Sequence, residues 1–374
     1  MINVETVFLG AALHGVALVL LLLFNGYSNR RANILLAVLV GLLTITMWNV
    51  FVYRSDAGRA ALIIDYYLWV TPLLWAPFLY LYVGQMTKQK PANAKLVLLH
   101  SLPALLAAVT QIPIHLLADT GPGAATGTLA YNAVVIFIYP QTATYALLSL
   151  QLLRTYRNAV KDSFSTIDAI NLNWLKTVVI VFSVVLMGDM SLNIPATFFS
   201  ASMPFFYNVI LLAEAGAIFA IGYLSLRQPE IIAGTSLPDP HQITETKIKY
   251  FGSAIDQQLG RELADKLDQD MTEQKLFLRN ALSLTELAEV MGLSTQNLSQ
   301  VINQHRHKNF YDYVNGYRAR YAADQLTLHG KVNLTRLAYD AGFNNKVSFN
   351  KAFRKYTGQT PSEFVRKQHD PALP

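Results

Sequence analysis

The stretch of sequence that decides the fold of the C-terminal region runs from residue 284 to residue 303 and reads LTELAEVMGLSTQNLSQVIN. Its apolar residues recur every three or four positions, first over Leu284–Met291 and then through Leu298 and Ile302. Gly292 suits the tight turn between these two segments, and Ser294 is a natural N-cap for the second. A helix, a short glycine-containing turn and a second helix form a helix-turn-helix.

The same pattern returns further along the chain, where Gly342 repeats Gly292 and Asn344 stands where Ser294 provides the cap. Between the two copies, Asn309–Leu326 has a continuous helical pattern, which predicts a rod of about 27 Å at about 1.5 Å per residue. A rod of this length would let the second helix of each copy enter successive major grooves of a DNA duplex, about 34 Å apart.

Charge is distributed unevenly along the chain. The 374 residues carry a net charge of +6, whereas Glu273–His369 alone holds 14 Lys+Arg against 7 Asp+Glu. The remainder is strongly apolar, so the front half and the basic tail are predicted to be separate domains. The chain has no Cys, which excludes disulfides, thiolate metal sites and cysteine nucleophiles.

The segment Leu284–Lys367 resembles the DNA-binding domain of AraC/XylS-type regulators. The resemblance rests on the two copies, on YRARYAADQL at residues 317–326 and on the closing YTGQTPSEF at residues 356–364. It implies two helix-turn-helix units that bind double-stranded DNA, in which exposed residues of each second helix read base edges. The residues at those positions are Gln296, Asn297, Ser299 and Gln300 in the first unit, and Asn345, Lys346, Val347, Asn350 and Lys351 in the second.

The chemistry of these side chains suits base recognition, since Gln and Asn can pair with adenine, Lys with guanine, and a Val methyl with the thymine methyl. Four further cations are predicted to contact phosphates: Lys308, Arg318, Arg354 and Lys355. Two departures from the family stand out. His307 replaces the usual Gly before the linker helix, which predicts a strained turn, and Thr295–Gln304 has no Lys or Arg. We therefore expect the second unit to dominate affinity.

Simpler interpretations of these residues remain open. The polar residues of the first unit could be solvated helix surface, and the basic tail could bind anionic lipid. His305 and His307 are interpreted as turn residues, because no second ligand cluster lies nearby to complete a metal site.

The front half, residues 1–226, is predicted to be a bundle of seven transmembrane helices. Each apolar stretch is long enough to cross a hydrocarbon core of about 30 Å. The fusion resembles the membrane-bound subgroup of the same regulators. The overall fold class is therefore all-α, a seven-helix bundle plus a double helix-turn-helix domain. The predicted spans are Val4–Phe24, Asn33–Tyr53, Leu62–Met86, Leu96–Leu117, Leu129–Leu153, Trp174–Phe198 and Phe205–Leu226.

Loop charges predict the orientation of the bundle. With the amino terminus outside, the inner loops and the start of the tail hold nine Lys and Arg residues, against two in the outer loops. An odd number of spans then places the C-terminal domain in the cytoplasm. The predicted location is the inner membrane of a bacterium, as a multi-pass protein.

Residues 227–272 are predicted to be a linker followed by an amphipathic helix, Glu245–Asp270. That helix could pack on its own DNA-binding domain, or it could serve as a dimerisation or signal-relay element. The DNA-binding domain is assigned to 273–369 and a short tail to 370–374. A homodimer on a repeated site is the expected working unit.

Short outer loops leave no room for a separate sensor domain, so a stimulus would be read within the bundle or from the bilayer. Ionisable groups at such depth are costly and usually face the interior. They could line a site for a small-molecule or lipid effector, or only hold helices together. The candidate sensing residues are His14, Asp65, Asp189, Asn193 and Glu214.

Three classes of function fit these features to different degrees. A one-component regulator, in which a membrane signal alters DNA binding, accounts for both halves. A transporter with a DNA-binding tail is disfavoured by the odd span count and the lack of an internal repeat. An enzyme is disfavoured because no nucleophile motif, phosphate loop or metal cluster is found. We expect a regulator without a cofactor.

Overall fold

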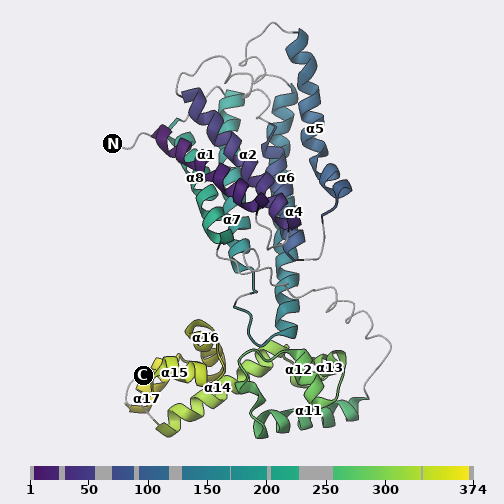
Figure 1. Cartoon of the computed structure of the whole chain (residues 1–374), viewed down its shortest axis with the longest axis vertical. Coiled ribbons are helices and arrows are strands. Elements are labelled where there is room, and N and C mark those ends of the chain that lie inside the picture. Colours follow the sequence, from purple (N-terminus) through teal and green to yellow (C-terminus); the bar gives the residue numbers. More distant parts are fainter. Residues whose placement is uncertain are drawn as a thin grey trace. The chain divides into compact units, whose positions relative to one another are not determined.

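The computed structural model describes residues 4–24, 30–54, 70–87, 92–117, 129–168, 170–199, 204–226, 256–329 and 332–369 (Figure 1). Within these ranges the chain is helical and forms no strand beyond an isolated bridge. It divides into two compact units, described separately below. The first, called the helical bundle below, comprises Met1–Arg154 and Leu172–Leu237. The second, called the C-terminal domain, comprises Thr155–Asn171 and Pro238–Pro374.

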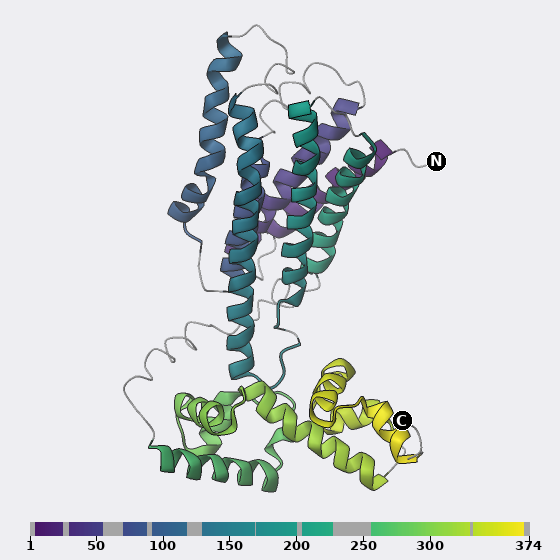
Figure 2. The same ribbon diagram turned by 180° about the vertical axis from the view of Figure 1, so that it is seen from behind.

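Within the described part of the first half of the chain, seven helices lie at the positions of the seven predicted spans. Helix α6 extends ten residues past the predicted end at Leu153, and residues 62–69 of the third predicted span lie outside the described residues. Helix α1 packs on α2 and α8, while α4 packs on α2, α5 and α7 (Figures 1 and 2). The helices are α1 (Val4–Phe24), α2 (Arg30–Arg54), α4 (Pro72–Met86), α5 (Ala94–Leu117), α6 (Leu129–Ser163), α7 (Asn173–Phe199) and α8 (Pro204–Leu226).

Three stretches within these helices are long and apolar enough to cross a membrane, judged by length and composition: Val4–Phe24, Arg30–Val52 and Phe205–Leu224. Ala94–Val109 is a shorter apolar helix. Of the seven predicted spans, three therefore meet this criterion within the described residues.

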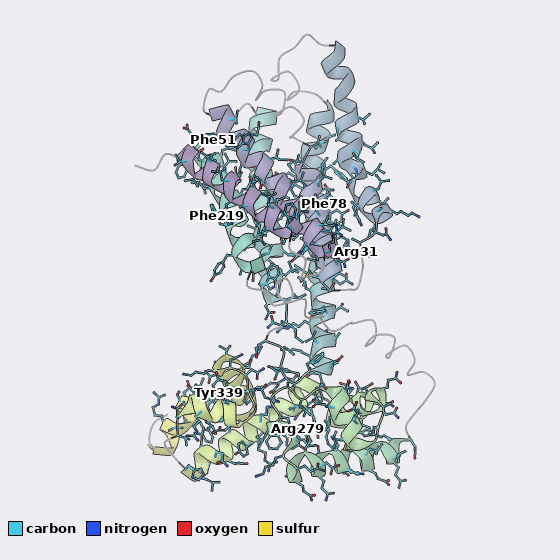
Figure 3. The ribbon with its side chains drawn as sticks, viewed as in Figure 1. Arg31, Phe51, Phe78, Phe219, Arg279 and Tyr339 are labelled. Atoms are coloured by element: carbon cyan, nitrogen blue, oxygen red, sulfur yellow. The ribbon has the colours of Figure 1, made fainter. Side chains whose placement is uncertain are left out.

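The C-terminal domain has two halves, each with its own hydrophobic core, joined by the long helix α14 (Phe310–His329). The first half contains α11 (Gln257–Glu273), the 3-10 turn η3 (Leu276–Leu278), α12 (Leu284–Met291) and α13 (Thr295–Arg306). The second half contains α15 (Leu334–Asp340), α16 (Lys346–Thr357) and α17 (Pro361–His369). Figure 3 labels one residue in each half, Arg279 in the first and Tyr339 in the second.

The predicted domain boundary at residue 272 is wrong, because α11 belongs to the first half of the C-terminal domain. Leu267 and Met271 of α11 are fully buried in the same core as Leu287 of α12 and Val314 of α14. The amphipathic pattern of this helix therefore reflects packing on its own domain. Residues 245–255 of the predicted helix lie outside the described residues.

Candidate nucleic-acid interface

Local capping interactions build the first helix-turn-helix as its sequence predicts. Ser283 and Glu286 form a reciprocal capping box that starts α12. Gly292 ends that helix in the left-handed conformation, with φ at +66°, where glycine carries no steric penalty. The Ser294 hydroxyl then accepts a hydrogen bond from the Asn297 backbone N–H, which starts α13.

The second helix-turn-helix has the same plan with one difference in register. Gly342 adopts a φ of +86°, and a Cβ there would come within 2.9 Å of the carbonyl oxygens of Phe277 and Leu278. Helix α16 is capped by Asn345, whose side chain accepts a hydrogen bond of 2.8 Å from the Ser348 N–H. The predicted cap at Asn344 is therefore wrong by one residue, because the second turn is one residue longer.

The predicted base-reading residues of α13 are partly buried. Gln300 donates to Gln304 at 3.2 Å, and Ser299 accepts from Asn303 at 3.3 Å, so the polar side chains of this helix already interact with each other. Helix α13 contains one Lys or Arg residue, Arg306, which is bound to Asp265 and Asp268. The first unit thus offers DNA little free positive charge.

The predicted base-reading residues of α16 include three that are well exposed: Lys346, Val347 and Lys351. Val347 exposes 77 % of its surface, which leaves its methyl groups open to a partner. Asn350 is partly buried, and Asn345 combines its predicted reading position with the capping role. Exposed lysines beside an exposed valine suit the edges of bases in a major groove.

Three of the four predicted phosphate contacts are on the surface, namely Lys308, Arg354 and Lys355. Lys355 forms an ion pair of 2.8 Å with Asp312 of α14. Together with Lys161, Lys308 and Lys351 it lines a cavity of about 470 Å³ between α14 and α16. Burial lowers the pKa of Lys161, and the charges of Arg157, Lys351 and Lys355 add to this effect, while Asp312 opposes it.

The predicted phosphate contact of Arg318 is wrong. Its side chain is fully buried, and the guanidinium donates to the carbonyl oxygens of Phe277 and Arg279 at 2.7 Å and of Asn280 at 3.1 Å. Burial lowers the pKa of Arg318 to about 10, which leaves it charged at pH 7. The Arg318 guanidinium also lies over the Phe343 ring, with Cζ 5.8 Å from the ring centroid, and this contact links the two halves of the C-terminal domain. Arg318 therefore has a structural role and holds the two halves of the domain together.

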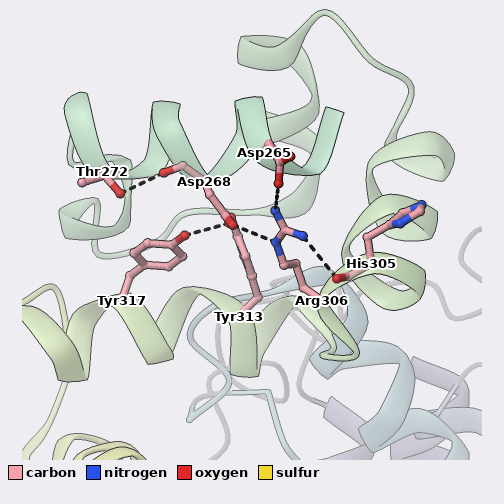
Figure 4. Close-up of polar contacts among 7 residues, drawn as sticks. All are labelled: Asp265, Asp268, Thr272, His305, Arg306, Tyr313 and Tyr317. Atoms are coloured by element: carbon pink, nitrogen blue, oxygen red, sulfur yellow. Dashed lines mark hydrogen bonds and ion pairs between the residues drawn. The ribbon is translucent and has the colours of Figure 1, made fainter. Parts of the chain in front are cut away.

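Helix α11 braces the first unit through a carboxylate that sequence reasoning missed. Asp268 accepts hydrogen bonds of 2.7 Å from the hydroxyls of Tyr313 and Tyr317 and from Nε of Arg306 (Figure 4). Burial raises the pKa of Tyr317 to about 12, and burial also raises the pKa of Tyr313, so both hydroxyls remain donors at neutral pH. Asp265 and Asp268 lie three residues apart, on one face of α11, and this spacing is the sequence feature that could have indicated a shared partner.

His307, which ends α13, has a φ of +52°, within the left-handed region. This confirms the strain predicted for this turn, since a side chain costs roughly 1–2 kcal/mol in that conformation. Within the described residues, no group of three or more His, Cys, Asp and Glu side chains could hold a metal ion.

The candidate sensing residues belong to the helical bundle. Asp189 on α7 and Glu214 on α8 are buried, and Oε1 of Glu214 has no hydrogen-bond partner among the described residues. Glu214 borders a cavity of about 10 Å³, enough for roughly one water molecule. His14 stacks on Phe219, with ring centroids 4.7 Å apart; Figure 3 labels Phe219. Asp65 and the side chain of Asn193 lie outside the described residues.

Comparison with known proteins identifies the C-terminal domain. A family profile described as a helix-turn-helix domain matches residues 287–367, so the chain carries an AraC-type helix-turn-helix domain at its C-terminus. The transcriptional regulatory protein YesN of Bacillus subtilis is 31 % identical over 118 residues, which cover 31 % of this chain and 30 % of YesN. GlxA of Rhizobium meliloti, a helix-turn-helix-type transcriptional regulator, is 28 % identical over 90 residues, or 24 % of this chain and 28 % of GlxA.

A helix-turn-helix-type transcriptional regulator of Staphylococcus aureus strain COL is 31 % identical over 100 residues, which cover 27 % of this chain and 13 % of the relative. The chain thus spans less than a third of the length of these relatives. No solved structure matches the chain.

Proposed function

We propose that this chain is a membrane-anchored transcription regulator that binds specific DNA sequences, mainly through α16, in response to a signal at its membrane domain. The observation that carries the proposal is the exposed row Lys346, Val347 and Lys351 on the second helix of a helix-turn-helix. In such motifs, the first residues of that helix contact base edges in the major groove. Named relatives that share this domain are transcriptional regulators, which supports the assignment.

The outward-facing side chains of the helical bundle support a membrane location for α5, α6 and α7 in addition to the three helices that meet the span criterion. Helices that fall short of the length and composition criterion also expose large apolar residues: Leu98 of α5 by 61 %, Leu147 of α6 by 69 % and Val184 of α7 by 65 %. Meanwhile Asp189 and Glu214 are buried. A water-soluble bundle would reverse this arrangement, whereas a bundle in lipid requires it. The positive-inside bias of the loops supports a cytoplasmic C-terminus.

Recovery of DNA crosslinked to the full chain in its native membrane would test the DNA-binding function. We expect discrete promoter fragments to be enriched in the membrane fraction, and we expect Lys346→Ala combined with Lys351→Ala to abolish the enrichment at unchanged protein level. Enrichment that is absent from the wild type, or unaffected in the variant, would contradict the proposal.

The orientation has its own test, because a chain without Cys can be labelled one site at a time. Gly123→Cys should react with an impermeant maleimide added outside intact cells, and Asn93→Cys should react only after lysis. The opposite pattern would place the DNA-binding domain outside the cell and refute the regulator.

A further inference from the structure

The segment between α6 and α7 is built into the DNA-binding unit. Residues 155–171 group with the C-terminal domain, although the sequence predicts them to be an inner loop of the bundle. Phe164 forms an antiparallel bridge with Ser283, and the Ser165 N–H donates to the carbonyl of Leu282 at 3.2 Å. The segment thus lies as an extended strip against the residues that precede α12.

Ser165 fixes this strip at the joint of the two helix-turn-helix units. It is almost fully buried, its hydroxyl donates to the carbonyl of Leu282 at 2.6 Å, and its own carbonyl accepts from Nδ2 of Asn315 at 2.9 Å. Nη2 of Arg318 lies 3.2 Å from the Ser165 hydroxyl. Thr166 adds a hydrogen bond of 2.8 Å to the carbonyl of Asn280. Buried, satisfied polar contacts of this kind specify one geometry for the strip.

The strip ends at Asp168, whose carboxylate contacts α16. The hydroxyl of Ser348, in the first turn of α16, donates to Oδ1 and Oδ2 of Asp168 at 2.7 and 2.9 Å. Ser348 follows the exposed Val347 directly and lies one turn before Lys351. Serine hydroxyls in this position are ordinary donors to DNA phosphates. Asp168 therefore places a negative charge on the flank of the helix that DNA would approach.

We propose that Phe164–Asp168 is an inhibitory clamp, in which the Asp168 carboxylate occupies Ser348 in place of a DNA phosphate. DNA and Asp168 compete for α16, so a signal that moves α6 or α7 changes DNA affinity by releasing or holding the clamp. The strip is continuous with both helices, which gives the bundle a second covalent route to the domain besides the chain after α8. This inference rests on the proposed DNA-binding function.

Removing the charge while keeping the shape tests the clamp. The full chain in lipid nanodiscs would be titrated with a fluorescent mixed-sequence duplex over a series of salt concentrations. We expect Asp168→Asn to bind at least about fivefold more tightly than the wild type, at the lower end of typical coupling between sites. The gain should shrink as the salt concentration rises, because salt screens the repulsion between the Asp168 carboxylate and the phosphates of the duplex.

Asp270→Asn is the matched control. It removes the same charge from α11, where the Asp270 carboxylate accepts only a local hydrogen bond of 3.1 Å from Gln274 among the side chains around it. If Asp168→Asn binds no more tightly than Asp270→Asn, the clamp is refuted while DNA binding stands. If neither the wild type nor the variants bind the duplex at low salt, the proposed function and the clamp fail together.

A second measurement does not depend on the charge of Asp168. Ile167 lies within the clamp and is buried, so Ile167→Cys should react slowly with a maleimide in the free protein. Saturating duplex should increase that rate severalfold, because Asp168 must leave Ser348. An unchanged or slower rate would show that the strip stays docked on DNA, and would overturn the competition.

Discussion

The two helix-turn-helix units share one plan but differ in what holds them and in what they offer to DNA. The first is braced by α11, and its one Arg is bound to Asp265 and Asp268. In the second, α16 is held by the ion pair of Lys355 with Asp312 and by the contact of Ser348 with Asp168. It also exposes three cations, Lys346, Lys351 and Arg354. We therefore propose that the first unit mainly supports the domain, while the second provides most of the DNA contact.

The largest effect is expected at the joint between the units. Arg318→Ala removes the hydrogen bonds from the guanidinium to three carbonyl oxygens, and a hydrogen bond from a charged donor is worth about 1.5–3 kcal/mol. We expect the domain to lose at least about 3 kcal/mol of stability, seen by hydrogen exchange on the full chain as loss of amide protection in α14. Unchanged protection with weaker DNA binding would instead support a phosphate contact.

The brace on the first unit should matter less, because the Asp268 side chain is 35 % exposed. Hydrogen bonds to a charged group are worth about 1.5–3 kcal/mol, and solvent screening reduces this, so we expect Asp268→Asn to destabilise the fragment Glu245–Pro374 by about 2 kcal/mol. Urea denaturation would measure the loss. Asp270→Asn on the same helix is the control and should change stability by less than about 0.5 kcal/mol.

The same network predicts a pH dependence. The pKa of Tyr317 is raised from 10.0 to about 12, so its contribution to stability is fully present below pH 10 and is lost as the pH rises through about 12. The midpoint of thermal unfolding should therefore fall over this range, and it should fall less steeply in Asp268→Asn. An equal slope in both proteins would show that the Asp268 contacts do not set this dependence.

The smallest effect is expected at the turn before α14, and it should be stabilising. His307→Gly removes a side chain from a left-handed residue, which should raise stability by roughly 1 kcal/mol. Thermal unfolding of the same fragment would detect it as a rise in the midpoint. Lys308→Gly, one residue later, is the control and should not stabilise. A lower midpoint for His307→Gly would mean that the imidazole makes a stabilising contact.

Local signals carried most of the fold prediction. Gly292, Ser294 and Gly342 marked the turns of the repeated motif, and long apolar runs placed seven helices, because these features act over a few residues. The sequence could not show that Arg318 is buried, since its partners lie some forty residues away around η3. Asp168 is further still from Ser348 in sequence, and no pattern near either residue indicates the contact. Such long-range polar pairings depend on tertiary structure alone.

The central claim is that α16 provides most of the DNA contact, and a comparison of two double variants tests it most directly. The full chain in nanodiscs would bind a promoter duplex recovered by crosslinking, with affinity measured by fluorescence anisotropy. Lys346→Ala with Lys351→Ala should weaken binding by at least about tenfold, since a good base contact is worth about 1–3 kcal/mol. Gln296→Ala with Gln300→Ala should weaken it by less than about threefold, because neutral helix surface adds little to phosphate attraction. Equal losses in the two variants, or a larger loss in the glutamine pair, would contradict the account.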